Sequence, residues 1–136
     1  MLDLGCGPAA PYAKPAGTFV IGVDLSLASL VDNRDVDLGV HASAASLPLA
    51  DRSDDVAAAI YAFHHMVGDT FNATIRNVEA AFAELARVTK PGGQVLILEI
   101  CPWLAAGSAE RLGWTAARRL VGKFIDFLFR TPQGYE

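Results

Sequence analysis

Apolar and polar positions alternate along the chain in blocks that predict strands and helices in turn. Three runs rich in Val, Ile or Ala, at residues 19–23, 56–61 and 95–98, are almost continuously apolar. Such runs are typical of strands that have both faces covered by helices. A further short, mostly apolar run opens the chain at residues 1–4 and ends at a glycine. Together these runs predict the strands of a buried parallel sheet.

The clearest helical pattern lies between the last two of these runs, in "TFNATIRNVEAAFAELARVTKPGG", residues 70–93. Its large apolar residues recur every three or four positions and form one stripe of a helix: Phe71, Ile75, Val78, Phe82, Leu85 and Val88. Thr70 is a suitable N-cap, and residues 90–93 supply a cation, a helix breaker and turn residues at the other end. Alternating strands and helices predict an α/β fold, a doubly wound parallel sheet with right-handed crossovers.

Two glycines, Gly5 and Gly7, follow the first predicted strand, and parallel sheets bind ligands beyond the carboxyl ends of their strands. Glycine lets the backbone turn tightly and approach a ligand closely. Asp24 ends the second predicted strand, where a carboxylate can accept hydrogen bonds from both ribose hydroxyls of a nucleoside. The pattern therefore predicts a cofactor that contains a nucleoside. The alternative is that the glycines only form a turn and that Asp24 only caps a helix beginning near Ser26.

Residues 5–10 also fit the dinucleotide pattern Gly-x-Gly-x-x-Ala, so a nicotinamide-dependent oxidoreductase is one interpretation. Two prolines, Pro11 and Pro15, interrupt the segment that would form the phosphate-binding helix. Pro8 and Pro11 also lack the backbone N–H that an anion needs. A cofactor without phosphate groups suits this loop better.

Composition narrows the function further. A chain of 136 residues that is 52% hydrophobic fits one domain with a substantial core. The formal net charge of −4 at pH 7 disfavours sequence-independent binding of nucleic acid. Cys6 and Cys101 are too few for a disulfide framework or a thiolate metal site. No run is long enough to span a membrane, and no signal-peptide pattern opens the chain. We expect a cytoplasmic protein that binds small molecules and has no metal.

Five segments in order resemble the class I S-adenosylmethionine (SAM)-dependent methyltransferases: "LDLGCGP", "VIGVDLS", "ASLPLADRSDDVA", "YAFHHM" and "ELARVTKPGGQVLILE". The likeness is to the ubiquinone and menaquinone biosynthesis branch, with some likeness to wobble-uridine tRNA methyltransferases. It covers about residues 1–100. It implies a Rossmann-like sheet with strand order 3-2-1-4-5. It also implies in-line transfer of a methyl group from SAM to a small organic acceptor, with S-adenosylhomocysteine as the product.

The resemblance implies ten cofactor-binding positions: Asp3, Gly5, Cys6, Gly7, Asp24, Leu25, Ser43, Ala44, Tyr61 and Phe63. In the family, the residue matching Asp3 helps to hold the methionine amino group, usually through water. The backbone of residues 5–7 surrounds the methionine part, and the residue matching Asp24 binds the ribose hydroxyls.

Two features bear on whether this chain is active. Ser43 stands where the family usually has the aspartate that binds the adenine amino group, and a hydroxyl bonds more weakly than a carboxylate. His64 and His65 match the frequent His-His pair of the family and are the candidate general bases for an acceptor such as a hydroxyl. The alternative for both histidines is a structural role. A methyltransferase-like remnant or partner subunit without activity is therefore the second hypothesis.

The family's first helix and last two strands have no counterpart in this sequence. We expect either that the chain is a fragment, or that a partner chain or second copy covers the open edge of the sheet. We divide the single domain into a cofactor-binding core at residues 1–100 and a basic, helical C-terminal segment at 101–136. That segment is interpreted as a cover for the sheet, a substrate lid, a membrane-contacting surface or an oligomer interface.

Overall fold

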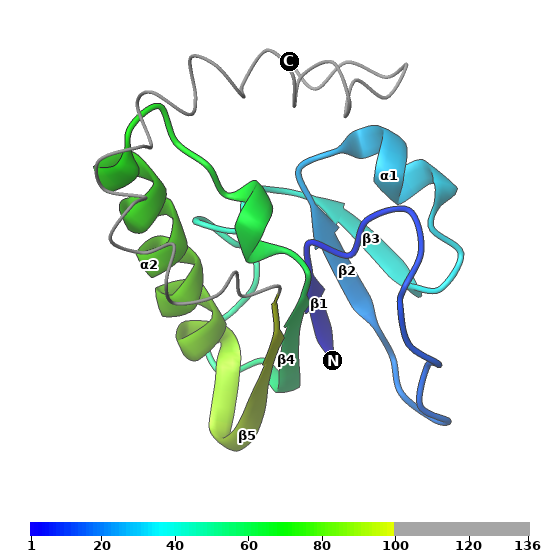
Figure 1. Cartoon of the computed structure of the whole chain (residues 1–136). Coiled ribbons are helices and arrows are strands. Elements are labelled where there is room, and N and C mark those ends of the chain that lie inside the picture. The colour runs from blue at the N-terminus through cyan, green and yellow to red at the C-terminus, as the bar shows by residue number, and fades with distance from the viewer. Residues whose placement is uncertain (100–136) are drawn as a thin grey trace.

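The computed structural model describes residues 1–99, which form a sheet flanked by helices (Figure 1). The five strands are β1 (Leu2–Leu4), β2 (Ile21–Asp24), β3 (Leu38–His41), β4 (Asp54–Ile60) and β5 (Thr89–Leu98). All pairs are parallel, in the order β3-β2-β1-β4-β5. The predicted fold class and strand order are confirmed. The predicted C-terminal helical segment, 101–136, lies outside the described residues.

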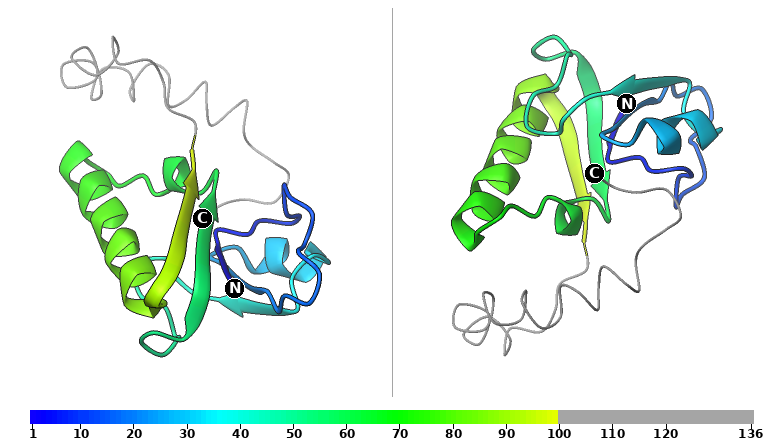
Figure 2. Two further views of the ribbon diagram at one scale, coloured as in Figure 1. Left: turned by 90° about the horizontal axis from the view of Figure 1, so that it is seen from below. Right: turned by 90° about the horizontal axis from the view of Figure 1, so that it is seen from above.

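Two α-helices and one 3-10 helix connect the strands: α1 (Leu27–Asp32), α2 (Phe71–Val88) and η1 (Phe63–His65). Contacts join α1 to β2 and β3, whereas α2 contacts β4 and β5. The two α-helices lie on opposite sides of the sheet (Figure 2). From β1 the sheet extends one way through β2 and the other way through β4, so the strand order reverses beside β1. The carboxyl ends of β1, β2 and β4 therefore surround the place where such sheets bind ligands.

The core lies around β1 and the inner part of β4. Leu2 and Leu4 are fully buried, as are residues 57–59 of β4. The predicted stripe of α2 is only partly buried. Its C-terminal half buries Ala81, Leu85 and Val88, whereas three predicted members stay 36–46% exposed among the described residues: Phe71, Ile75 and Phe82. The prediction of α2 itself is confirmed, since the Thr70 hydroxyl accepts a hydrogen bond from Ala73 N at 3.1 Å.

The segment between β1 and β2 contains no helix, which agrees with the predicted interruption by its prolines. Side-chain contacts from the chain after α1 hold it in place. Asp35 Oδ2 accepts from Ala10 N at 2.8 Å, and Asp37 pairs with Lys14 and accepts from Val20 N. The first glycine turn therefore leads into an extended loop.

One predicted boundary is wrong. Residues 90–93 were expected to form a turn before a strand at 95–98, but they lie inside β5, which begins at Thr89. The pairing shifts register here, with Asp54 opposite Thr89 and Val56 opposite Gln94. At this register shift the backbone still turns locally, because Gly92 has φ +81°. A Cβ at Gly93 would lie 2.8 Å from the carbonyl oxygen of Asp55.

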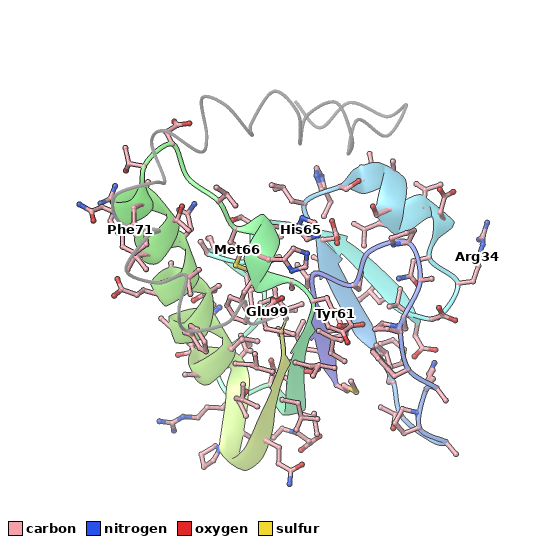
Figure 3. All side chains as sticks on the ribbon, viewed as in Figure 1. Arg34, Tyr61, His65, Met66, Phe71 and Glu99 are labelled. Atoms are coloured by element: carbon pink, nitrogen blue, oxygen red, sulfur yellow. The ribbon has the colours of Figure 1, made fainter. Side chains whose placement is uncertain are left out.

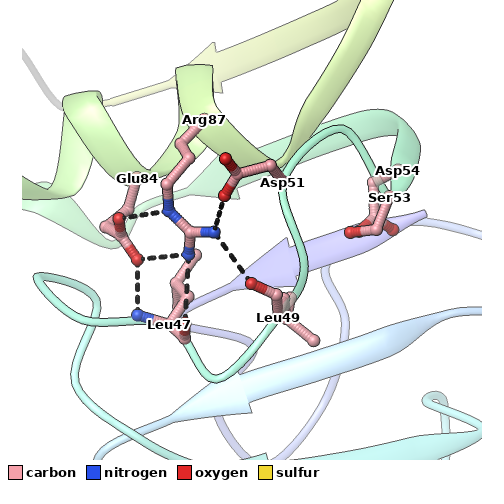
Figure 4. Close-up of polar contacts among 7 residues, drawn as sticks. All are labelled: Leu47, Leu49, Asp51, Ser53, Asp54, Glu84 and Arg87. Carbon is pink, nitrogen blue, oxygen red and sulfur yellow. Dashed lines mark hydrogen bonds and ion pairs between the residues drawn. The ribbon is translucent and has the colours of Figure 1, made fainter.

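Arg87, near the end of α2, anchors the "LPLADRSDD" loop that precedes β4 (Figure 4). Its guanidinium donates to Glu84 at 2.7 and 2.8 Å, to Asp51 Oδ1 at 2.6 Å and to the carbonyl oxygens of Leu47 and Leu49 at 3.1 and 2.8 Å. Glu84 Oε2 also accepts from Leu47 N at 2.6 Å. These contacts fix the start of β4 against α2.

The Glu84 carboxylate gives this anchor a pH dependence. Its hydrogen bonds with Arg87 lower the pKa of Glu84 from 4.5 to about 2. A depressed folded-state pKa stabilises the fold above the unfolded-state value, and the contribution is lost as the pH falls from about 4.5 towards about 2. We expect Glu84→Gln to reduce the free energy of unfolding in urea at pH 7 and to reduce it less at about pH 3. Glu79→Gln, on the exposed side of α2, is the control. An equal loss at both pH values would contradict the assignment.

No helix within residues 1–99 is both long and apolar enough to cross a membrane.

Candidate functional site

The glycine turn after β1 packs directly against the end of β4. Gly5 and Gly7 have φ +71° and +57°, in the left-handed region that favours glycine. Gly5 N donates to Val23 O of β2 at 2.7 Å. A Cβ at Gly5 would lie only 2.6 Å from the Cβ of Ala62. Glycine at position 5 therefore allows the ends of β1, β2 and β4 to meet.

Asp24 joins this turn to the start of α1. Its Oδ2 accepts from Gly7 N at 2.9 Å and its Oδ1 from Ser26 N at 2.8 Å. Part of the structural alternative is thus observed, although the N-cap of α1 is Ser26, whose hydroxyl accepts from Ser29 N. Each carboxylate oxygen has two lone pairs, so both retain capacity for a further donor.

Asn33, which follows α1, was missed by sequence reasoning. Its buried amide donates to the carbonyl oxygens of Gly7 at 2.8 Å and Cys6 at 3.3 Å. Its Oδ1 accepts from the backbone N–H groups of Asp35 and Val36. The side chain therefore holds the second half of the glycine turn. No spacing rule links an asparagine at a helix end to a turn 26 residues earlier.

Asp3 lies in the middle of β1 and is only 1% exposed. The Tyr12 hydroxyl donates to its Oδ2 at 2.7 Å. Burial raises the pKa of Asp3, the Tyr12 hydrogen bond partly opposes this, and the nearby Asp24 carboxylate adds to the rise. Burial, with a smaller effect of the same two carboxylates, also raises the pKa of the Cys6 thiol to about 12. Cys6 is therefore a neutral thiol and a poor nucleophile.

The residues after β4 combine strain with exposure. Tyr61 has φ +55°, rare for a bulky residue, and its side chain is 44% exposed. Its N–H donates to Leu98 O at 2.8 Å, which ties the strained residue to the end of β5. Such outliers persist where the surrounding structure imposes them, often at ligand sites. Phe63 is instead buried, with its ring stacked at 4.7 Å on Phe82 of α2.

The two histidines of η1 differ in how they are held. His64 Nδ1 lies 2.8 Å from Oε1 of Glu99, the residue after β5. The His65 ring lies 4.0 Å from that of His64. Burial lowers the pKa of His65, and the neighbouring His64 lowers it further, against the opposite effects of Glu99 and Asp24. Tyr61, His65 and Glu99 lie at the same end of the sheet (Figure 3).

The remaining predicted site residues lie at the ends of β2 and β3. Ser43 is exposed two residues after β3, and its hydroxyl accepts from Ala45 N at 3.2 Å. Ala44 packs against the core. Leu25 is 71% exposed, and its carbonyl oxygen lies 2.9 Å from His41 Nε2. The topology thus brings the predicted residues that follow the three inner strands, β1, β2 and β4, to the same end of the sheet, with Ser43 and Ala44 after the outer strand β3.

Comparison with known proteins assigns the chain to a family. A family model described as a methyltransferase domain matches residues 2–97. The chain belongs to the class I SAM-dependent methyltransferases. The matched part covers β1 to β4 and the whole glycine turn, and it ends one residue before the end of β5.

Individual relatives agree with the family assignment. The chain is 32% identical over 102 residues to the demethylmenaquinone methyltransferase of Corynebacterium glutamicum, covering 73% of this chain and 40% of the relative. It is 34% identical over 99 residues to a tRNA (carboxymethyluridine(34)-5-O)-methyltransferase of Arabidopsis thaliana, covering 71% and 23%. A solved SAM-dependent methyltransferase of Thermotoga maritima matches with a TM-score of 0.54 at 26% identity, over 71% of this chain and 42% of that one. The chain thus spans less than half the length of these relatives.

Proposed function

We propose that this chain binds SAM at the glycine turn and forms the core of an enzyme that methylates a small organic acceptor. The observation that carries the proposal is Asp24, which ends β2 and accepts from Gly7 N of the turn at 2.9 Å. The contact brings the Asp24 carboxylate next to Gly7, a residue without a Cβ. Both lie beside β1, where the strand order reverses. A nucleoside needs both features, an acceptor for its ribose hydroxyls and close access to the backbone.

The residues present fit SAM, whose sugar carries no phosphate. The loop after the turn has no helix, so it lacks the helix N-terminus that binds a pyrophosphate. Pro8 and Pro11 offer no N–H to an anion. In the proposal, Asp24 accepts from the ribose hydroxyls and residues 5–7 surround the methionine part. Asp3 supports the methionine amino group through water or the Tyr12 hydroxyl, because its own carboxylate is buried.

SAM supplies a methyl group that is already activated as a sulfonium. The protein's part is to hold the acceptor in line with that methyl group, because fixing two reactants at near-contact distance removes several kcal/mol of barrier. In the proposal Tyr61 contacts the ligand, which its exposure directly after β4 supports. His64 or His65 takes the proton when the acceptor is a hydroxyl or another group of high pKa.

A small acceptor fits the chain better than a nucleic acid. The net charge is −4 at pH 7, whereas binding to a phosphate backbone relies on clustered cations. The demethylmenaquinone methyltransferase of C. glutamicum is named for a small-molecule acceptor. This chain spans 40% of that relative, so the proposal names the class of acceptor and not the acceptor itself.

Calorimetric titration with S-adenosylhomocysteine tests the proposal. We expect saturable binding of S-adenosylhomocysteine and none of the nicotinamide dinucleotide, which needs a phosphate site that the loop lacks. The chain's folding is checked by circular dichroism in the same buffer. A folded chain that binds no S-adenosylhomocysteine at millimolar concentration would sink the proposal and favour the inactive remnant. One observation favours that second candidate: the Ser43 hydroxyl, which stands where the family usually has the adenine-binding aspartate, already accepts a hydrogen bond from Ala45 N.

A further inference from the structure

Glu99 connects the end of β5 to η1 with both of its carboxylate oxygens. Oε2 accepts from Phe63 N at 2.7 Å and from His64 N at 3.3 Å, and Oε1 lies 2.8 Å from His64 Nδ1. The residues are 35 and 36 positions apart in the chain. One side chain therefore holds both the backbone that carries His64 and the ring itself.

This arrangement decides which ring nitrogen carries the proton. An ionised carboxylate can only accept hydrogen bonds, and a neutral imidazole has one donor and one acceptor nitrogen. Nδ1 faces Glu99, so Nδ1 must be the donor. Nε2 is then left with the lone pair. In general, the hydrogen bond made by one ring nitrogen sets the role of the other.

We propose that Glu99 is a positioning residue for methyl transfer: it fixes His64 as the Nδ1–H tautomer, with Nε2 as the proton acceptor. This inference rests on the proposed function. The acceptor's O–H or N–H bond gives its proton to Nε2, and the electron pair of that bond becomes available for methyl transfer. The resulting imidazolium keeps its Nδ1–H on the Glu99 carboxylate, which stabilises the charge.

The neighbouring His65 lacks such a constraint. Within residues 1–99, no side chain forms a hydrogen bond with the His65 ring, which is held by its contact with the His64 ring at 4.0 Å. No carboxylate of the described residues therefore sets its tautomer. This difference selects His64 from the two candidate bases that the sequence presents.

Glu99→Gln tests the inference with almost no change in shape. The backbone N–H groups of Phe63 and His64 require an acceptor at the Oε2 position, so the amide oxygen of glutamine is expected there. The amide NH₂ then faces His64 Nδ1 and makes it an acceptor. We expect the variant to lose the Nδ1–H tautomer and to carry the proton on Nε2, the opposite of the wild-type protein.

Long-range ¹H–¹⁵N spectra of the histidine rings in the full chain at neutral pH measure this directly, with His64→Gln to assign the signals. Glu79→Gln is the matched control and should leave the tautomer unchanged. A wild-type His64 protonated on Nε2, or a Glu99→Gln variant that keeps the Nδ1–H form, would overturn the inference. S-adenosylhomocysteine binding, measured on the same samples, should be unchanged by Glu99→Gln. Absence of binding in the wild-type protein would refute the proposed function, while the tautomer result would still decide the role of Glu99.

Discussion

Replacing Asp24 with alanine is expected to weaken S-adenosylhomocysteine binding by about a hundredfold or more. The substitution removes both carboxylate oxygens proposed to accept from the ribose hydroxyls. Two hydrogen bonds to a charged group contribute about 3 kcal/mol or more, which corresponds to about a hundredfold in Kd. It also leaves Gly7 N and Ser26 N without their acceptor. Titration calorimetry measures the change in Kd, and urea unfolding measures the separate effect on stability.

Asp37→Ala is the matched control for Asp24→Ala. Asp37 also accepts from a backbone N–H, that of Val20 at 2.7 Å, but it lies before β3 and so at the opposite end of the sheet. We expect this control to reduce stability without changing the Kd. Asp24→Asn, which keeps one acceptor oxygen, should bind with intermediate affinity. If the Asp24→Ala protein bound S-adenosylhomocysteine as the wild type does, the proposal that the nucleoside binds at the glycine turn would be wrong.

The second large effect is expected for Gly5→Ala, which should lower the free energy of unfolding by about 2 kcal/mol or more. An alanine pays a strain penalty at φ +71° and would place its Cβ 2.6 Å from that of Ala62. Relief of that clash requires the end of β4 to move away from the glycine turn. Because Tyr61 lies at that end, binding of S-adenosylhomocysteine should weaken as well. Urea unfolding and calorimetry measure the two effects.

Gly17→Ala separates backbone strain from the clash. Gly17 has φ +74°, close to that of Gly5, but within residues 1–99 no heavy atom beyond its two chain neighbours lies within 4 Å of a Cβ built there. The control should therefore lose only the strain component, about 1 kcal/mol. Adding Ala62→Gly to Gly5→Ala should restore part of the lost stability, since it removes the clashing atom. Equal losses for Gly5→Ala and Gly17→Ala would show that contact with β4 does not constrain the turn.

Much of the fold could be predicted because it depends on local sequence patterns. Continuous apolar runs indicate strands covered on both faces, and the Thr70 cap with the stripe after it indicates α2. Pro11 and Pro15 predict that the helix after the first turn is interrupted, and the structure has no helix there. Each of these predictions depends on residues within one turn or a few positions of one another. One error arose where pairing with β4 intervened: β5 begins at Thr89, earlier than the apolar run at 95–98 predicts.

The candidate site divides in the same way. Gly5, Gly7 and Asp24 were predictable, because glycine permits the turn and a parallel sheet gathers the carboxyl ends of its strands. Asn33 and Glu99 were not. Asn33 holds a turn 26 residues before it, and Glu99 holds a ring 35 residues before it. Neither residue type is unusual at its own position, so nothing local marks it.

The sequence by itself determined the α/β class, the proline-interrupted glycine loop and the residues that are proposed to bind a nucleoside, because backbone preferences and hydrophobic periodicity act over short distances. Only the tertiary structure decided how those residues are held: Asp24 to Gly7 N, Arg87 to the loop before β4, and His64 to Glu99. Hydrogen bonds require their two atoms to be about 3 Å apart in defined directions. For residues distant in the chain, that geometry is set by how the strands pair and how the helices pack on them.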